Sequence, residues 1–187
     1  MESIVKYIYE AGMLKRVARS GWWAEKVKHP ESVADHCFRA AVIGFVLARM
    51  EGKSDDVARK ICTALVFHDM HETRMLDLNK IANRYIDVKG IGRKIEEDQA
   101  EKMPDDIRKS VLAVLELGEE EKAIKHDADA LECAFQAKEY VETGHEGAQS
   151  WITNIGPRLK TKSAKQLYEK MKEMNSNSWW KGLKKID

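Results

Sequence analysis

Apolar residues recur every three or four positions along most of this chain, which is the spacing that places them on one face of an α-helix. A first stripe runs over residues 4–14. Ser32, with Asp35 three residues later, has the pattern of a helix-capping pair and predicts a helix from there to about Met50. No stretch keeps the strict alternation of apolar and polar residues that is typical of a half-buried strand. The pattern therefore predicts an all-α fold.

Turn-forming and capping residues divide the rest of the chain into further helices. Ser54 precedes two aspartates and predicts the start of a second long helix, along which His68 lies. Residues 76–92 are less regular and are predicted to form a loop with one short helix. The remaining predicted helices are one ending near Met103, one that Pro104 begins and Gly118 stops, one reaching Gly144, and two more separated by Pro157.

Composition and charge fit an ordinary globular protein. The 187 residues, 43% hydrophobic and 34% charged, predict one domain over residues 1–187. Basic and acidic residues number 32 and 31, so no overall charge attracts nucleic acid or an anionic membrane. The longest apolar stretch, residues 40–48, is far shorter than the ~20 residues of a transmembrane helix. The three cysteines are widely spaced among apolar residues, as expected of reduced thiols in a cytoplasmic protein.

The segment FHDMHE, residues 67–72, concentrates coordinating side chains. His68 and Asp69 would point about 100° apart on a helix, so both can reach one ion at their shared edge. Taken alone, this doublet fits the polar face of an amphipathic helix better than a metal site.

Two residues elsewhere add to the doublet. His36 lies beside an apolar run near the start of a predicted helix, and Asp129 lies in a helix with apolar residues that look core-facing. A carboxylate there should be buried, and a metal ion would offset the cost of burying it. The alternatives are a salt bridge for Asp129, and a hydrogen-bonded core histidine or a cap for His36.

A lone histidine, a His-Asp doublet and a later aspartate in a helical chain resemble the HD-domain phosphohydrolase superfamily. The local sequences ESVADH, ALVFHDMHE and KHDADALE are more similar still to its 5′-deoxynucleotidase branch, over about residues 5–145. The resemblance implies a helical HD domain, a homodimer and a divalent metal ion, and it assigns the ion to His36, His68, Asp69 and Asp129.

A second His-Asp doublet, His126-Asp127, precedes Asp129 by two residues. The resemblance assigns the ion to Asp129, which directly precedes Ala-Leu. Asp127 would point to a different side of the helix. His126 and Asp127 are therefore predicted to lie on the surface or just behind the metal ligands.

Two imidazoles and two carboxylates form a mixed nitrogen and oxygen ligand set without thiolate, unlike a finger-type structural zinc site. Such a set leaves coordination positions for water and a phosphate oxygen, as a hydrolytic site requires. It admits one divalent ion, with Mn²⁺, Co²⁺, Mg²⁺, Ni²⁺, Fe²⁺ and Zn²⁺ all compatible.

Glu72 lies four residues after His68, so on a continuous helix it projects from the same face one turn along. A carboxylate there can take a proton from an attacking water or give one to a leaving oxygen. The resemblance places a catalytic glutamate at this position, and a solvent-facing glutamate is the alternative. His71 shares part of the face and is predicted to contact the phosphate or a metal ligand.

Substrate contacts are predicted at residues 19–23, where the resemblance implies an Arg-Trp pair that contacts a nucleotide. Arg19 suits phosphate because its planar guanidinium gives charge-assisted hydrogen bonds. Two residues separate it from Trp22, which departs from the family pattern, so Trp22 or Trp23 fills the second role or both are core. Asp77 matches a family carboxylate that contacts the sugar, where it could accept a bond from the 3′-hydroxyl.

Residues 146–187 lie outside the resemblance and carry the tail SWWKGL. Few basic residues interleave with its tryptophans, so we expect an aromatic plug that packs on the body or on a partner subunit, rather than a base-stacking surface.

The sequence as a whole predicts a metal-dependent hydrolase of nucleoside 5′-monophosphates that prefers deoxyribonucleotides. The rivals are hydrolysis of a nucleoside triphosphate or a cyclic nucleotide, and a non-catalytic metal or nucleotide sensor. A di-metal redox site would need extra histidine ligands, and no convincing second metal can be placed with those available.

Overall fold

The computed structural model describes residues 1–183, and its regular elements are helices. Across this described part the only strand-like pairing is a single β-bridge between Ala18 and Ser32. The prediction of an all-α fold is confirmed. The end of the predicted tail, residues 184–187, lies outside the described residues.

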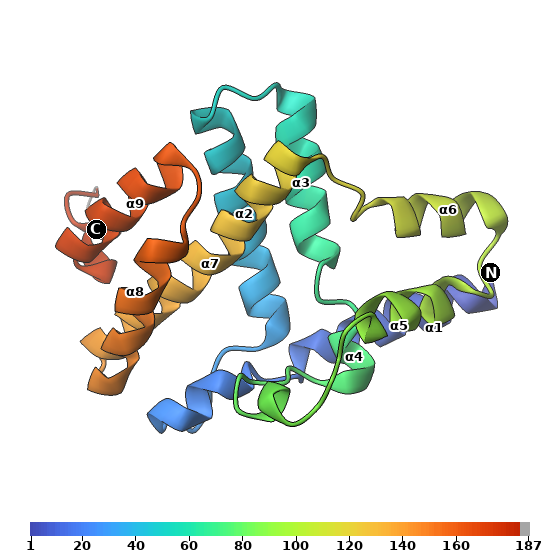
Figure 1. The fold of residues 1–187 in the computed structure, drawn as a ribbon, viewed down its shortest axis with the longest axis horizontal. Coiled ribbons are helices and arrows are strands. Elements are labelled where there is room, and N and C mark those ends of the chain that lie inside the picture. The colour runs from blue at the N-terminus through green and yellow to red at the C-terminus, as the bar shows by residue number, and fades with distance from the viewer. Residues whose placement is uncertain (184–187) are drawn as a thin grey trace.

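Figure 1 shows a centre of three helices, α2 (Val33–Met50), α3 (Asp55–Phe67) and α7 (Glu119–Glu142). On one side lie α8 (Gln149–Ile155) and α9 (Lys162–Glu173). The other side carries α1 (Glu2–Ala11), α4 (Glu72–Met75), α5 (Ile91–Ala100) and α6 (Asp105–Ala113). Short 3₁₀ turns occur at Gly12–Lys15, Ser20–Glu25, Ala82–Arg84, Glu146–Ala148, Gly156–Arg158 and Ser176–Trp180.

Side-chain caps begin two of the central helices where the sequence predicts them. At the start of α2, the Asp35 N–H donates to Ser32 Oγ at 3.2 Å and the Ser32 N–H donates to the Asp35 carboxylate at 2.9 Å. At the start of α3, the Val57 N–H donates to Ser54 Oγ at 3.3 Å. These bonds satisfy amides that have no partner inside their own helix.

Two helix ends differ from the prediction. α3 ends at Phe67, and Glu72 begins the separate helix α4 after a turn. The turn brings Met70 into an apolar cluster with Leu14, Val17, Val33 and Cys37, and this tertiary packing outweighs the helical pattern. α6 ends at Ala113, before the predicted Gly118, and none of its residues is buried to hold a further turn in place.

The main core lies between the central helices and the α8–α9 side. Leu47, Ile61, Leu65 and Leu131 are completely buried within it. His36 lies on α2 between residues of the smaller cluster and Ala40 of the main core. The packing of two apolar clusters therefore fixes the position of a buried histidine.

Gly44 on α2 permits the close approach of α3. A Cβ atom there would overlap Leu65 Cδ1 and lie 3.2 Å from Ile61 Cγ2, and both side chains are fully buried. We expect Gly44→Ala to lower the free energy of unfolding by about 1–3 kcal/mol, because the extra methyl group overpacks the core. Urea unfolding measures this. Gly12→Ala, with no atom within 4 Å of the added Cβ, is the matched control and should change stability little. Equal stability of the two variants would contradict the expectation.

The tryptophan-rich tail does not form the expected plug on the body of the chain. Trp179 and Trp180 are 72% and 52% exposed. The segment is held instead through Ser176, whose N–H donates to the Glu142 carboxylate at 3.0 Å. Packing on a partner subunit stays a prediction. Among the helices of residues 1–183, none combines the length and the apolar character needed to cross a bilayer.

Candidate active site

The four predicted metal ligands meet where α2, the turn after α3, and α7 approach one another. His36 Nε2 lies 3.2 Å from Asp129 Oδ1 and 3.8 Å from Asp69 Oδ2. His68 Nε2 lies 3.1 Å from Asp69 Oδ2 and 4.0 Å from Asp129 Oδ1. Residues that are up to 93 positions apart in sequence thus form one cluster, which we call the His–Asp cluster.

Each imidazole in the cluster has an unpaired Nε2 close to the carboxylates of the cluster. The other nitrogen is occupied: His36 Nδ1 is hydrogen-bonded to the Glu132 carboxylate, and His68 Nδ1 lies 2.7 Å from the carbonyl oxygen of Leu65. A neutral imidazole that donates from Nδ1 presents a lone pair at Nε2. Within residues 1–183, both Nε2 atoms are buried and lack a hydrogen-bond partner. This donor set fits a divalent ion.

The carboxylates of the cluster shift the pKa values of its members. Burial lowers the pKa of His36, but the nearby carboxylates of Asp129 and Glu132 outweigh burial and raise this pKa to about 10. Burial alone would raise the pKa of Asp129, but the contact with protonated His36 and the charge of Arg19 hold it well below its usual value. Burial lowers the pKa of His68 and favours its neutral form. Binding of a divalent ion would therefore release a proton from His36.

Glu132 holds the His36 ring through a hydrogen bond to Nδ1, on the side away from the cluster. This residue was not predicted from the sequence. It is fully buried on α7, and its Oε1 accepts hydrogen bonds from Arg39 Nε at 2.9 Å and Arg39 Nη2 at 2.8 Å. Arg39 also donates to Glu139 at 2.8 Å. The signal was the spacing: Glu132 follows Asp129 by three residues and Arg39 follows His36 by three, so each pair shares a helix face.

Glu72 lies beside the cluster, although α3 does not continue to it. The turn after α3 is closed by a hydrogen bond from the Glu72 N–H to the Asp69 carbonyl at 2.9 Å. Glu72 is only 9% exposed, which does not fit a solvent-facing glutamate, and its buried Oε2 lacks a partner within residues 1–183. Burial, together with the charges of Asp69 and Asp77, raises the pKa of Glu72 to about 9. A carboxyl group that can hold a proton therefore lies next to the candidate metal ligands.

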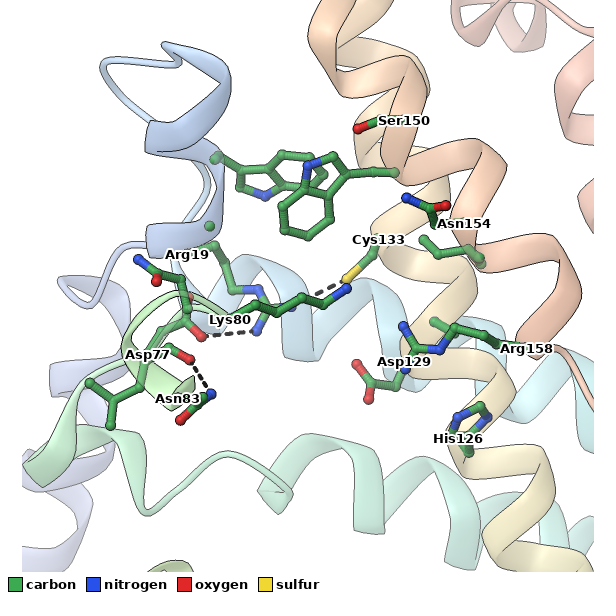
Figure 2. A pocket seen from close by; sticks show the side chains of 17 residues that line it. Arg19, Asp77, Lys80, Asn83, His126, Asp129, Cys133, Ser150, Asn154 and Arg158 are labelled. Carbon is green, nitrogen blue, oxygen red and sulfur yellow. Dashed lines mark hydrogen bonds and ion pairs between the residues drawn. The ribbon is translucent and has the colours of Figure 1, made fainter. Parts of the chain in front are cut away.

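A cavity of about 410 Å³ opens beside the cluster and contains Asp129 in its wall. Asp129 is half-buried, with 40% of its side chain exposed because it faces this cavity, so it is less buried than predicted. Figure 2 shows the charged and polar walls, with Arg19, Asp77, Lys80 and Asn83 on one side and Asp129, His126, Asn154 and Arg158 on the other.

Three of the predicted substrate contacts line this cavity. Arg19 Nη1 lies 3.6 Å from Asp77 Oδ1, and Arg19 Nη2 donates to Cys133 Sγ at 3.2 Å. Trp22 is 1% exposed and lies in the cavity wall, whereas Trp23 is 56% exposed and lies outside it.

His71 is placed apart from the cavity. Its Nδ1 lies 3.6 Å from the Glu96 carboxylate and its ring lies close to Gly92, both on α5. One ligand atom each from Asp69, His71 and Glu72 nevertheless fall within 4.8 Å of one another. His71 therefore lies beside Glu72 on the α5 side of the cluster.

Asp127 is buried, so the prediction of a surface position is wrong for it. Its carboxylate accepts hydrogen bonds from the Lys160 N–H at 2.9 Å and the Thr161 N–H at 2.6 Å. These bonds tie the segment before α9 to α7. His126 is half-buried and lines the cavity.

A helical fold that brings two histidines and two aspartates together beside an open polar cavity defines a class of helical hydrolases. The chain belongs to the HD domain family. The family model matches residues 11–174, which run from the end of α1 through α8 and α9. It is a hydrolase of this family.

Curated relatives and solved structures agree with this assignment. The human 5′-deoxynucleotidase HDDC2 is 33% identical over 152 residues, which cover 76% of this chain and 71% of the relative. The structure of the coding region AF1432 from Archaeoglobus fulgidus is 35% identical with a TM-score of 0.71, covering 96% of this chain and 100% of that one. The cyanophage S-2L HD phosphohydrolase DatZ, solved with dA and one catalytic Zn²⁺ ion, shares the fold at 14% identity, with a TM-score of 0.58 over 89% of this chain and 96% of that one.

Proposed function

We propose that this chain is a metal-dependent phosphomonoesterase that releases phosphate from nucleoside 5′-monophosphates, preferentially deoxyribonucleotides. The observation that carries the proposal is the pair of buried, unpartnered Nε2 atoms of His36 and His68 beside two carboxylates. The adjoining cavity has room for a small ligand, since such pockets usually measure about 300–1,000 Å³. The names of the curated relatives support a deoxynucleotide substrate.

The ion would be held by His36, His68, Asp69 and Asp129. Its identity stays open among Mn²⁺, Co²⁺, Mg²⁺, Ni²⁺, Fe²⁺ and Zn²⁺, because nitrogen and oxygen ligands suit all of them. When bound, a divalent ion polarises a phosphate oxygen and lowers the pKa of a coordinated water.

The remaining roles belong to side chains around the ion. Glu72 moves the proton between the attacking water and the leaving oxygen, for which its raised pKa and its place beside Asp69 suit it. Arg19 binds the phosphate and Asp77 accepts a hydrogen bond from the sugar 3′-hydroxyl. Trp22, which belongs to the main core and is 1% exposed, limits the space for the sugar from behind the cavity wall. His71 contacts the phosphate or positions Glu72, which lies next to it.

Glu132→Gln is expected to weaken metal affinity by about 10–100-fold, the usual effect of losing the carboxylate behind a ligating histidine. The buried hydrogen bond to His36 Nδ1 holds the ring and its tautomer in place. Calorimetric titration of metal-free protein with Mn²⁺ or Zn²⁺ measures the change. Glu139→Gln is the matched control, because Glu139 bonds Arg39 but not His36. An equal loss of affinity in both variants would assign the effect to Arg39 or to the fold instead.

The function is tested by phosphate release from a nucleotide panel. Metal-stripped protein would be resupplied singly with Mn²⁺, Co²⁺, Mg²⁺, Ni²⁺ or Zn²⁺ and offered deoxyribonucleoside and ribonucleoside monophosphates, triphosphates and cyclic nucleotides. We expect metal-dependent release from the deoxyribonucleoside monophosphates, with little from ribonucleotides. Bound metal without release of phosphate would reject the proposal in favour of a sensor, and turnover of triphosphates or cyclic nucleotides alone would identify a different HD-type reaction.

We also propose that the chain acts as a cytoplasmic homodimer built from one domain per copy. The dimer follows from the family resemblance, and the location from the wide spacing of Cys37, Cys62 and Cys133 among apolar residues. Sedimentation at several protein concentrations would test the dimer directly.

A further inference from the structure

Two cations in the cavity wall have no acidic partner. Lys80 lies on the loop after α4, and Arg158 lies in the 3₁₀ turn after α8. Within residues 1–183, neither side chain has a carboxylate oxygen within 4.0 Å, the separation that defines an ion pair. Arg19, the third permanent cation in the wall, is paired with Asp77 at 3.6 Å. Two positive charges of the cavity are therefore left for a ligand.

Both cations have a structural reason to stay at the cavity. Lys80 Nζ lies 5.5 Å from the ring centroid of Trp151, a cation–π contact with the aromatic part of the wall. Arg158 follows Pro157, which limits the backbone. Two and three residues later, the amides of Lys160 and Thr161 are tied to α7 by Asp127. Figure 2 shows the side chain of Arg158 beside Asp129 and His126.

The charges already assigned in the site balance one another. A divalent ion in the His–Asp cluster is neutralised by Asp69 and Asp129, and Arg19 is neutralised by Asp77. A phosphomonoester carries close to two negative charges near neutral pH, whereas a phosphodiester carries one. A monoester therefore needs two further positive charges nearby, and the cavity wall holds two.

We infer, resting on the proposed function, that Lys80 and Arg158 are specificity-determining residues that select the dianionic phosphate of a monoester over the monoanionic phosphate of a diester. Arg158 can hold two phosphate oxygens with its planar fork, and Lys80 acts as a point charge from the facing wall. The selection disfavours cyclic nucleotides, which are diesters, without any steric barrier.

The test compares the affinity of the metal-loaded full chain for inorganic phosphate and for dimethyl phosphate, a monoanionic diester, by calorimetry at pH 8. Arg158→Gln and Lys80→Gln are each expected to weaken phosphate binding by about 10–100-fold, the effect of losing a charge-assisted hydrogen bond. Dimethyl phosphate affinity should change by less than about threefold, the scale of a weak surface charge effect. Arg158→Lys should restore most of the phosphate affinity, because it keeps the charge.

Lys160→Gln is the matched control, since Lys160 is exposed, lies two residues from Arg158 and does not line the cavity. Unchanged phosphate affinity in the Arg158 and Lys80 variants, equal losses for both ligands, or a wild-type protein that binds neither ligand would each overturn the inference. The measurement needs no turnover. Charge-selective phosphate binding without nucleotide hydrolysis would thus reject the proposed function and keep this inference, and hydrolysis without such selectivity would do the reverse.

Discussion

Glu72→Gln is expected to lower kcat for a deoxyribonucleoside monophosphate by about 10²–10⁴-fold, the usual contribution of a general acid–base group. Glutamine keeps the size of the side chain but cannot exchange a proton. Glu72 is not among the four residues of the His–Asp cluster, so the metal content of the variant should equal that of the wild type. Steady-state kinetics, with metal content measured by mass spectrometry, tests both parts.

The same substitution is expected to raise the stability of the metal-free protein, although it lowers kcat. The folded protein holds the Glu72 proton up to about pH 9, whereas the carboxyl group ordinarily loses it near pH 4.5, so ionisation opposes folding between these values. Metal-free Glu72→Gln protein is therefore expected to melt at a higher temperature than the wild type at pH 7–8. The gain should vanish below about pH 4.5, where both states hold the proton.

Glu97→Gln, on the exposed face of α5, is the control and should change neither kcat nor this pH dependence. A Glu72 variant with wild-type kcat would remove the proton-transfer role. A variant that loses both activity and metal would instead make Glu72 part of the metal site. Raised stability combined with lost turnover is the pattern expected of a residue retained for chemistry rather than for folding.

Helix periodicity and capping residues predict most of the fold because these signals are local. Ser32 and Ser54 cap their helices in the structure as their neighbours in sequence suggest. The end of α3 could not be predicted in this way, since it depends on Met70 packing against residues from α2 and from the segment before it. Packing of one side chain against residues distant in sequence was enough to replace a helical turn.

The candidate ligands could be predicted because the family pattern marks them, but their support could not. The bond between His36 and Glu132 spans 96 positions. The three-residue spacings place Glu132 and Arg39 on the faces of the ligands, but they do not show that Glu132 meets His36. Lys80 and Arg158 lie in irregular segments without periodicity, and only the folded chain brings both to one cavity. Residues that tertiary packing brings to the site thus cannot be predicted from the sequence, even where the metal ligands can.

Asp129→Asn and Asp127→Asn are expected to differ in their effect on metal affinity, although the two aspartates are only two residues apart on α7. Asp129→Asn should weaken metal binding by more than about 100-fold and remove turnover, because loss of a ligand exceeds the 10–100-fold cost of losing an outer partner. Its stability without metal should also fall at neutral pH, because the ion pair with His36 is lost, so metal affinity is the measurement that separates the two variants. Asp127→Asn should keep metal affinity but lower the free energy of unfolding by about 1–3 kcal/mol, because a buried, charge-assisted contact to two amides is weakened.

Metal titration and urea unfolding of both metal-free variants separate the two roles. Loss of metal affinity in Asp127→Asn alone would exchange the roles and place the ion on the other side of α7. Loss in both variants would indicate that the segment held by Asp127 is needed to shape the metal site, because this segment carries Arg158 to the same cavity. The two carboxylates contact different parts of the chain: Asp127 binds the segment before α9, and Asp129 faces the His–Asp cluster. The pair is therefore a sharp test of which side of α7 binds the ion.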